Sequence, residues 1–545
     1  MTPVRQLGVA DIAIIASIAY LIHLIIKRRR ATKSISTPLK GPPSKSRIFG
    51  VTQDPQFFTD SGALYEEWGA KYGSVYTIPM ILGRKKTVLL DPKAISNFYV
   101  KETSVYVGTP FSKKFIARIF GKGLLWAEGE SHRRQRKALT PAFSNAALRR
   151  LTAVFYDSAY KLKTHWDNQL ENHPDGDVIE VQDWMNHVAL DSIGIAGFSH
   201  DFGSLDGKPS SVVHAFESLG TAPSTTFGRI LFLLSFVFPW LFYVPTERTN
   251  KLLELRKSMT QIANEMLAKS RRAGEDNSII GLLIKAENSH EKGEGELHMT
   301  AEEVEAQNVL LLAGYETTSI SLTWALIELS KSPAKQDLLR KELLETKGGQ
   351  DAGWDDLMTS DKSPYLDAVV HEVLRLHPPL AETTRVATED DVLPLSAPIT
   401  TKDGREVMSL SIAKGTTVSS PISCMNRSEL VWGKRAKEFI PERWMERAPG
   451  TQEAEAEVIP ASAKEIQGYR HLLTFSDGPR TCLGKNFALS EFKAVLSVLI
   501  KNYRFEFPEG PETKIELARG VLPRPKVEGA VGPKIPLRVR RVEED

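Results

Sequence analysis

The sequence predicts a mainly α-helical body with a smaller β-rich part, preceded by one N-terminal transmembrane helix. Helical patterns dominate from about residue 120 onward, whereas the segment before it mixes short helices with β-type runs such as 74–83 and 85–91. A third observation is a long apolar run near the N-terminus that ends in a block of basic residues. We therefore expect a membrane anchor at 1–30, a proline-rich hinge at 31–48 and one large domain at 49–545.

Composition and charge exclude several classes of protein. Hydrophobic residues make up 41% and charged residues 25% of the chain, as in an ordinary globular protein. The formal net charge is +3, and no basic block is long enough to form a nucleic-acid surface, so no nucleic-acid partner is expected. Two cysteines cannot build a disulfide framework, which favours a reducing compartment or a cytosol-facing membrane protein.

The N-terminal apolar run extends from about Gly8 to Ile26, close to the ~20 residues that a spanning helix needs. One lysine and three arginines follow at 27–30, and only Arg5 precedes the run. Because basic flanks stay in the cytosol, the body is predicted to be cytosolic. A cleaved signal peptide carries its charge before a shorter apolar core and is the weaker alternative. Prolines at 38, 42 and 43 cannot continue a helix, so the hinge is predicted to be a stiff linker.

Three helices are predicted in the central part of the chain. Thr300 and Glu303 form a capping-box pattern before an apolar-periodic run that stops at Pro333, which predicts a helix crossing the whole core. A second helix is expected from Pro333 to about Lys347. A third is expected within 363–379, where it begins with Pro364 and ends before Pro378.

The segment 229–245 is strongly apolar but contains Pro239. Neither half is therefore long enough to span a bilayer. The segment forms either a buried helix pair or a surface that dips into the membrane and admits apolar ligands.

Cys482 is the candidate reactive residue. It lies in "FSDGPRTCLG", just before the amphipathic run 483–500, so helix N-terminal N–H groups and Arg480 favour a thiolate there. Gly478 and Gly484 let the backbone approach a flat, bulky group. No Cys/His spacing accompanies the thiol, so zinc is not expected, and taken alone the thiol could equally be structural. Cys424 lacks such surroundings and is expected to be a small core residue.

The segment around Cys482 resembles the haem-binding signature of the cytochrome P-450 superfamily, Phe-x-x-Gly-x-Arg-x-Cys-x-Gly. Every fixed position is matched, by Phe475, Gly478, Arg480, Cys482 and Gly484. Three further motifs of the superfamily stand in the right order: "AGYETT" at 313–318, Glu-x-x-Arg at 372–375 and "FIPERW" at 439–444. The resemblance covers the whole chain, and the segments "HRRQRKALTPAFS" and "LRLHPPL" are similar to those of fungal microsomal members.

This resemblance implies that Cys482 is the metal ligand, binding the iron of haem b through its thiolate, with Phe475 shielding the sulfur. It also implies that Arg136, Arg385 and Arg480 contact the haem propionates. His132 occupies a position where the family often has Trp, so its role is open. The residues expected to bind the cofactor are Cys482, Arg480, Phe475, Gly478, Gly484, Arg136, His132, Arg385 and Gly314.

In the same superfamily, Gly314, Glu316 and Thr317 correspond to the oxygen-activation stretch. A threonine that bonds back to helix carbonyls opens a groove for oxygen and water. The resemblance implies that Thr317 hydrogen-bonds the bound oxygen and that Glu316 helps to relay protons, so these two are the expected catalytic residues.

A structural triad is implied on the haem side of the fold. Glu372 and Arg375 are three residues apart and share a helix face, which alone would also fit a weak surface ion pair. The family joins such a pair to the arginine that Arg443 matches, as a buried triad.

The implied function is that of a haem-thiolate monooxygenase. It would insert one oxygen atom from O2 into a hydrophobic substrate, by hydroxylation or successive oxidation, with a sterol or terpenoid as the first expectation. The substrate pocket is expected among residues 104–123, 208–245, 310–317 and 380–384. The alternatives are a haem-thiolate isomerase or dehydratase, against which Glu316–Thr317 argues, and a non-catalytic membrane haem-binding protein.

The implied partners follow from this function. No GxGxxG pattern follows a strand, so the electrons of NADPH are expected from a separate cytochrome P-450 reductase. We expect it to dock on a basic face that carries Arg133, Arg134 and Lys137, and cytochrome b5 is a further implied partner. The implied location is the endoplasmic reticulum membrane, single-pass, with the catalytic domain in the cytosol. The glycosylation sequon at Asn426 is then accidental.

Overall fold

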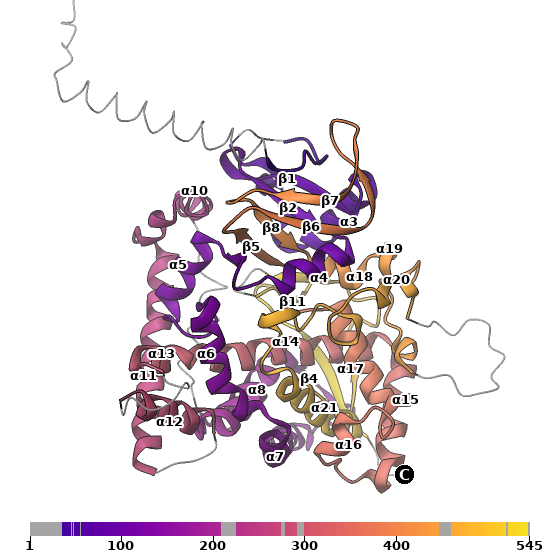
Figure 1. Ribbon diagram of the computed structural model, residues 1–545. Coiled ribbons are helices and arrows are strands. Elements are labelled where there is room, and N and C mark those ends of the chain that lie inside the picture. The colour runs from indigo at the N-terminus through magenta and orange to yellow at the C-terminus, as the bar shows by residue number, and fades with distance from the viewer. Residues whose placement is uncertain are drawn as a thin grey trace, which may run out of the picture.

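The computed structural model describes residues 35–542 apart from 45, 47, 55, 209–224, 274–277, 292–298, 446–458 and 519–521. The predicted anchor at 1–30 lies outside the described residues and stays a prediction. The described chain forms a large helical part with a smaller β-rich part at one end (Figure 1), which confirms the predicted fold class of the body. Within that described part, Ala301–Lys331 is long and apolar enough to cross a membrane, but most of it is buried inside the protein.

The β-rich part is built on a five-stranded sheet with the order β1-β2-β8-β5-β3. The predicted β-type runs form the antiparallel hairpin of β1 and β2, and β8 joins β2 in parallel. The strands of this sheet are β1 (Val75–Pro79), β2 (Lys85–Leu89), β3 (Tyr106–Gly108), β5 (Thr383–Ala387) and β8 (Thr417–Ser420).

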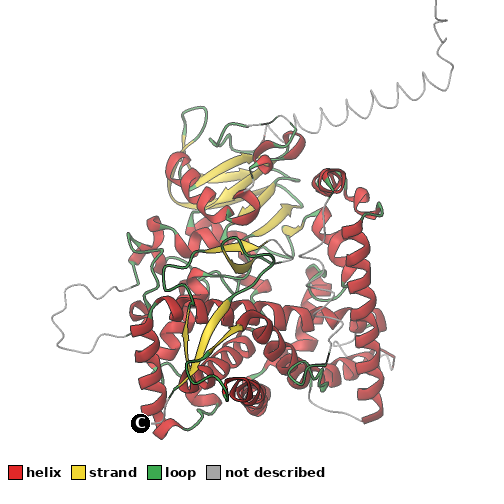
Figure 2. Cartoon of the chain, turned by 180° about the vertical axis from the view of Figure 1, so that it is seen from behind, coloured by secondary structure: helices red, strands yellow, loops and turns green. Residues whose placement is uncertain are grey.

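Three smaller sheets complete the strands of the described chain, and Figure 2 shows some of them among the helices. β6 pairs with β7, β10 with β11, and β12 lies between β4 and β9. Their bounds are β4 (Asp177–Glu180), β6 (Asp391–Thr400), β7 (Glu406–Ile412), β9 (Tyr503–Glu506), β10 (Ile515–Ala518), β11 (Arg524–Val527) and β12 (Pro536–Arg541).

The described part of the predicted hinge is attached to this β-rich part. Thr37 N donates to Ser411 O at 3.0 Å, and Thr77 N donates to Lys40 O at 2.9 Å. A Cβ at Gly41 would lie 1.9 Å from the Thr77 carbonyl oxygen, so the chain crosses β1 at very close range there. Residues 37–41 therefore follow the surface of the folded body.

Helices make up the rest of the body. They are α2 (Gln56–Thr59), α3 (Ser61–Tyr72), α4 (Pro92–Val100), α5 (Pro110–Ile119), α6 (Gly129–Leu139), α7 (Asn145–Leu170), α8 (Val181–Phe198), α10 (Thr226–Ser235), α11 (Glu247–Ala273), α12 (Ile279–Glu291), α13 (Ala301–Glu305), α14 (Val309–Lys331), α15 (Pro333–Glu345), α16 (Trp354–Met358), α17 (Pro364–Leu376), α18 (Ile422–Arg427), α19 (Glu429–Trp432), α20 (Ala461–Lys464) and α21 (Lys485–Asn502). α14 crosses the middle of the molecule (Figure 1) and packs on α8, α17 and α21 within the main core.

The predicted long helix is present but interrupted. Thr300 and Glu303 form the capping box, and α13 then passes through the short 3-10 turn η5 (Ala306–Asn308) into α14. The turn lies where the loop before α6 presses on the helix, because a Cβ at Gly123 would lie 2.5 Å from Ala306 O. Gln307 also reaches across to accept from Leu124 N. The interruption thus depends on long-range contacts.

The other predicted elements hold with small shifts. α15 and α17 are the second and third helices. α17 begins at Pro364 and ends at Leu376, before Pro378, as predicted. The apolar segment 229–245 forms the end of α10 and the 3-10 helix η4 (Pro239–Tyr243), divided at Pro239 as predicted.

Candidate functional site

The Cys482 loop is held by its own backbone and by α4. Cys482 N donates to Phe475 O at 2.8 Å, and the N-cap of α21 is Gly484, two residues on. Gly478 has φ +63°, and a Cβ there would lie 2.3 Å from the Tyr99 carbonyl oxygen. Glycine at 478 is thus required by contact with α4. A Cβ at Gly484 would meet only Phe143, at an ordinary 3.7 Å.

Cys482 keeps an exposed surface although protein atoms surround its thiol. Burial raises the pKa of the thiol above the usual value. The Gly484 N–H, Arg136 and Lys485 lower that pKa but do not outweigh burial. The helix N-terminus thus lowers the pKa of the thiol as expected, but desolvation is the larger effect, and the cations that act on the thiol are Arg136 and Lys485. Cys424, in contrast, is buried in the core as expected, and burial raises its pKa to about 12.

Three predicted cofactor residues lie around a fourth, His132. This ring is buried, and burial together with the positive charges of Arg480, Arg136 and Arg385 lowers its pKa to about 4. Arg136 is also an electrostatic neighbour of the Cys482 thiol. The structure thus brings together a neutral imidazole and three cations from α6, β5 and the Cys482 loop, next to the thiol.

Two carboxylates that the sequence analysis missed contact these cations. Arg480 donates to Glu128 Oε2 at 2.6 Å and to the Ala127 carbonyl oxygen. Arg385 Nε lies 2.9 Å from Glu102 Oε1, whose pKa is raised because burial outweighs its two arginine neighbours. No sequence pattern marks Glu102 or Glu128, since each lies in a turn between elements.

These residues fit a haem group. The Nε atom of Arg480 is buried and makes no hydrogen bond, so this arginine keeps a donor for a propionate oxygen. His132, being neutral, can donate one ring N–H, as an indole would at that position. With the accessible thiol of Cys482, the chain supplies one soft ligand for iron and a cationic end for two carboxylates.

The oxygen-activation stretch of α14 has two different faces. Ala313 is exposed and Thr317 is half-buried, although most of α14 is buried. The Thr317 hydroxyl donates to Ala313 O at 2.7 Å, the backward bond expected for this residue. A Cβ at Gly314 would lie 2.8 Å from Ile193 Cγ1 of α8. Gly314 therefore allows close packing of α14 on α8.

Glu316 points toward the β10–β11 hairpin. Its carboxylate accepts from Arg524 of β11 at 3.2 Å and is almost completely buried. Burial raises the pKa of Glu316, and Arg524 and the Leu522 N–H only partly oppose this. The structure thus gives Glu316 a partner that the sequence analysis did not name.

Glu372, Arg375 and Arg443 form one buried cluster. Arg375 binds Glu372 through two hydrogen bonds of 2.8 Å, and Arg443 Nε donates to the same carboxylate at 3.0 Å. Burial alone would raise the pKa of Glu372, but the two arginines outweigh it and the pKa is lowered. Arg375 also donates to the carbonyls of Asn426 and Ala436. The cluster therefore ties α17 to the chain that leads toward the Cys482 loop.

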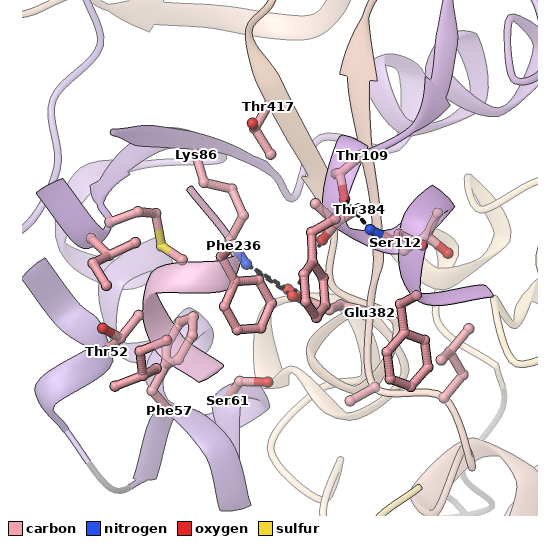
Figure 3. Close-up of a pocket in the computed structure, with 18 of the residues that line it drawn as sticks. Thr52, Phe57, Ser61, Lys86, Thr109, Ser112, Phe236, Glu382, Thr384 and Thr417 are labelled. Carbon is pink, nitrogen blue, oxygen red and sulfur yellow. Dashed lines mark hydrogen bonds and ion pairs between the residues drawn. The ribbon is translucent and has the colours of Figure 1, made fainter. Parts of the chain in front are cut away.

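A cleft of about 2720 Å³ runs from the hinge past the five-stranded sheet to α5 and α10. Figure 3 shows part of it, with Lys86 pointing toward Glu382. Its lining includes residues from 108–116, 225–249 and 380–384, as predicted, together with Arg385 and Arg480. From α14 it includes Ile320, Trp324 and Glu328 instead of 310–317.

Comparison with known proteins agrees with this geometry. Residues 42–529 match the family model described as cytochrome P450. The chain is 56% identical to cytochrome P450 monooxygenase claP and 55% identical to claQ of Ampulloclitocybe clavipes, in both cases over the full length of both chains. It is also 31% identical to ganoderic acid synthetase CYP5150L8 of Ganoderma lucidum, over 91% of this chain and 92% of the relative.

Proposed function

The chain belongs to the cytochrome P450 family and is an oxidoreductase, and from this premise we propose that it is a membrane-associated monooxygenase of an apolar small molecule. The observation that carries the proposal is the group of cations and neutral His132 beside an accessible Cys482 thiol. A sterol or terpenoid is the first substrate class, because the cleft is lined mainly by apolar side chains.

The proposed roles at the cofactor follow from the contacts. Cys482 binds the haem iron, and when bound the haem supplies the redox chemistry that activates O2. Arg136, Arg385 and Arg480 bind the propionates, with His132 as a neutral donor. Arg136 and Lys485 already lower the pKa of the thiol, and both therefore favour the thiolate that a metal ligand must be.

Thr317 and Glu316 have the proposed catalytic roles. The Thr317 hydroxyl holds a proton at the half-buried face of α14 and can exchange its bond to Ala313 O for one to a bound molecule. Burial raises the pKa of Glu316, which makes its carboxylate a better proton acceptor than an exposed one. The ion pair between Glu316 and Arg524 must weaken when Glu316 takes up a proton.

An apolar surface next to the cleft supports entry of substrate from a membrane. Phe227 is 68% and Trp240 61% exposed, and both belong to the segment that forms α10 and η4. Large exposed aromatics in one segment are typical of a surface that lies in the headgroup region. Together with the predicted anchor, these exposed aromatics support our proposal that the cleft mouth faces the bilayer.

We propose that the electron donor is a separate NADPH reductase that docks near α6. Arg133 is exposed and pairs with Glu130, whereas Arg134 forms a half-buried pair with Glu303 at 2.5 Å. Arg133 and Lys137 are therefore the residues to neutralise, and Arg134 is not. The test measures the rate of haem reduction by the reductase in the Arg133→Gln/Lys137→Gln variant. A rate and a salt dependence equal to those of the wild type would exclude this surface as the docking site. Cytochrome b5 is proposed as a second donor to the same face.

The function is tested by reconstituting the full chain with haem, a fungal reductase and NADPH, and screening apolar compounds under ¹⁸O2. A monooxygenase gives a product that contains one ¹⁸O atom per oxidation, with matching NADPH use. Product without label would indicate the isomerase or dehydratase alternative. Haem binding without substrate-dependent NADPH use across the screen would indicate a haem-binding protein. One relative is named for the synthesis of an acid, ganoderic acid, so the products are also searched for carboxylic acids.

A further inference from the structure

Glu491 is a completely buried carboxyl group that the proposed reaction does not use. It lies on α21, nine residues after Cys482, within a stretch that is buried without a break from Leu489 to Ile500. Its exposed fraction is 0%, and neither carboxyl oxygen makes a hydrogen bond of good geometry. A buried charge without a partner costs several kcal/mol, so such a group is normally paired or neutral.

The neighbours of Glu491 are two hydroxyl groups from two other helices. Ser192 of α8 and Thr318 of α14 are buried and are close enough to lower the pKa of the carboxyl through hydrogen bonding, although burial raises it well above its usual value. Neither hydroxyl has another side-chain or backbone partner of good geometry. Among the described residues, no Lys or Arg is near enough to pair with Glu491.

A proton on Glu491 completes the hydrogen bonding of all three groups. A neutral carboxyl group has one O–H donor and a carbonyl acceptor, and each hydroxyl can both donate and accept. The carboxyl can therefore donate to one hydroxyl and accept from the other, which an ionised carboxylate cannot do.

The contact between Thr318, Ser192 and Glu491 lies on one particular face of α14. Thr318 is four residues from Gly314 and so lies on the same face of the helix. Gly314 packs on Ile193 of α8, and Ser192 is the next residue of α8. The contacts of Gly314 and Thr318 therefore fix the face of α14 that is turned away from Ala313 and Thr317.

We propose that Glu491, as a neutral carboxylic acid, bonds Ser192 and Thr318 and thereby fixes the rotation and register of α14 at Thr317 relative to the helix that follows Cys482. Glu491 is thus a positioning residue. The inference about helix register stands on these contacts alone, and its consequence for oxygen use rests on the proposed monooxygenase function.

The test compares Glu491→Gln with Glu491→Leu. Gln keeps the shape, one donor and one acceptor, whereas Leu leaves both hydroxyls buried without a partner. Ser497→Ala on α21 is the matched control, because the Ser497 hydroxyl donates to Ala494 O of its own helix and otherwise neighbours Tyr156 of α7, not α8 or α14. Thr318→Val, which removes one partner at constant size, is the second variant if Glu491→Leu fails to fold.

The first readout is independent of activity. Infrared spectra of the full chain at pH 7.5 should show the carbonyl band of a protonated carboxyl that disappears in Glu491→Gln. Hydrogen exchange of the peptides that cover α14 around Thr317 should be about tenfold faster in Glu491→Leu or Thr318→Val, and unchanged in Glu491→Gln and Ser497→Ala. A band that persists in Glu491→Gln, or exchange that is equally fast in Gln and Leu variants, would overturn the proposal.

The second readout uses the haem-loaded enzyme with its reductase. Glu491→Leu is expected to release at least threefold more hydrogen peroxide per NADPH, while Glu491→Gln stays within twofold of the wild type. Changed exchange with unchanged peroxide release would contradict the positioning of Thr317. If no variant, including the wild type, forms product, the monooxygenase function fails while the exchange and infrared results still decide the role of Glu491.

Discussion

Replacing Glu372 by Gln should destabilise the protein severely, because the carboxylate is the centre of a fully buried cluster. It accepts from Arg375 at 2.8 and 2.8 Å, from Arg443 at 3.0 Å, and from Ile440 N and Trp444 Nε1 at 2.9 Å each. The glutamine amide keeps one acceptor and turns a donor toward two buried guanidinium groups.

The magnitude follows from the burial of the pair. Glu372 and Arg375 are both 0% exposed, and removing one partner of a buried ion pair costs about 3–5 kcal/mol, since the other charge stays buried without compensation. That is a large fraction of the ~5–15 kcal/mol by which a domain is stable. Arg149 and Asp355 make a comparable short contact at the surface, so Asp355→Asn is the matched control and should leave stability unchanged.

The assay is denaturant unfolding of the haem-loaded full chain, followed by both tryptophan fluorescence and haem absorbance. We expect a lower midpoint and loss of haem for Glu372→Gln only. Because the pKa of Glu372 is lowered in the folded state, its contribution is present above the usual carboxyl pKa and is lost as the pH falls through the folded-state pKa. The wild type should therefore lose this part of its stability in acid, and the variant should not. A Glu372→Gln midpoint equal to that of Asp355→Asn would refute the reasoning.

Three further predictions follow from single side chains. The pKa of His132 is about 4 in the folded protein against an ordinary 6.5. Acidification from pH 6.5 to 4 should therefore lower the unfolding free energy of the wild type by up to about 3 kcal/mol, because the unfolded chain takes up the proton first. His132→Gln should lack this loss when unfolding is measured as a function of pH. Thr317→Ala should divert NADPH from product to hydrogen peroxide several-fold in a coupled assay, and Thr317→Ser should restore coupling, since only the hydroxyl that now bonds Ala313 O is needed; equal coupling in all three proteins would exclude this role. Asn426 is completely buried and its amide bonds Thr474 Oγ1 and Leu473 N, so a eukaryotic host should add no glycan there and a glycosidase should not shift the mass.

The sequence predicted those features that depend on local pattern. The capping box at Thr300, the helix interruption at Pro239 and the N-terminus of α21 after Cys482 are set by residues next to each other in the chain, and all are present. Likewise, the backward bond of Thr317 to Ala313 O follows from its position in a helix.

Features that depend on long-range packing could not be predicted. The turn η5 interrupts the long helix because the loop before α6 presses on Ala306. Gly314 was assigned to the cofactor from its motif, but only the packing of α8 shows that its missing side chain makes room for Ile193. Glu491 is the lone acidic residue of α21, a signal that periodicity alone did not interpret.

The pKa of the Cys482 thiol is another property that depends on long-range packing. The helix N-terminus and nearby cations do lower the pKa of the thiol, but the desolvation that outweighs them comes from the whole surrounding fold. Partners such as Glu102 and Glu128 are also defined only once β5, α6 and the Cys482 loop meet.

The most direct test of the account is the reduced carbon-monoxide difference spectrum of the haem-loaded full chain, with Cys482→Ser beside it. The account predicts the strongly red-shifted Soret band of a thiolate-ligated carbonyl in the wild type and its absence in the variant. A wild type that binds haem without that band, or a Cys482→Ser variant that keeps it, would contradict the assignment of Cys482 as the ligand, and with it the proposed function.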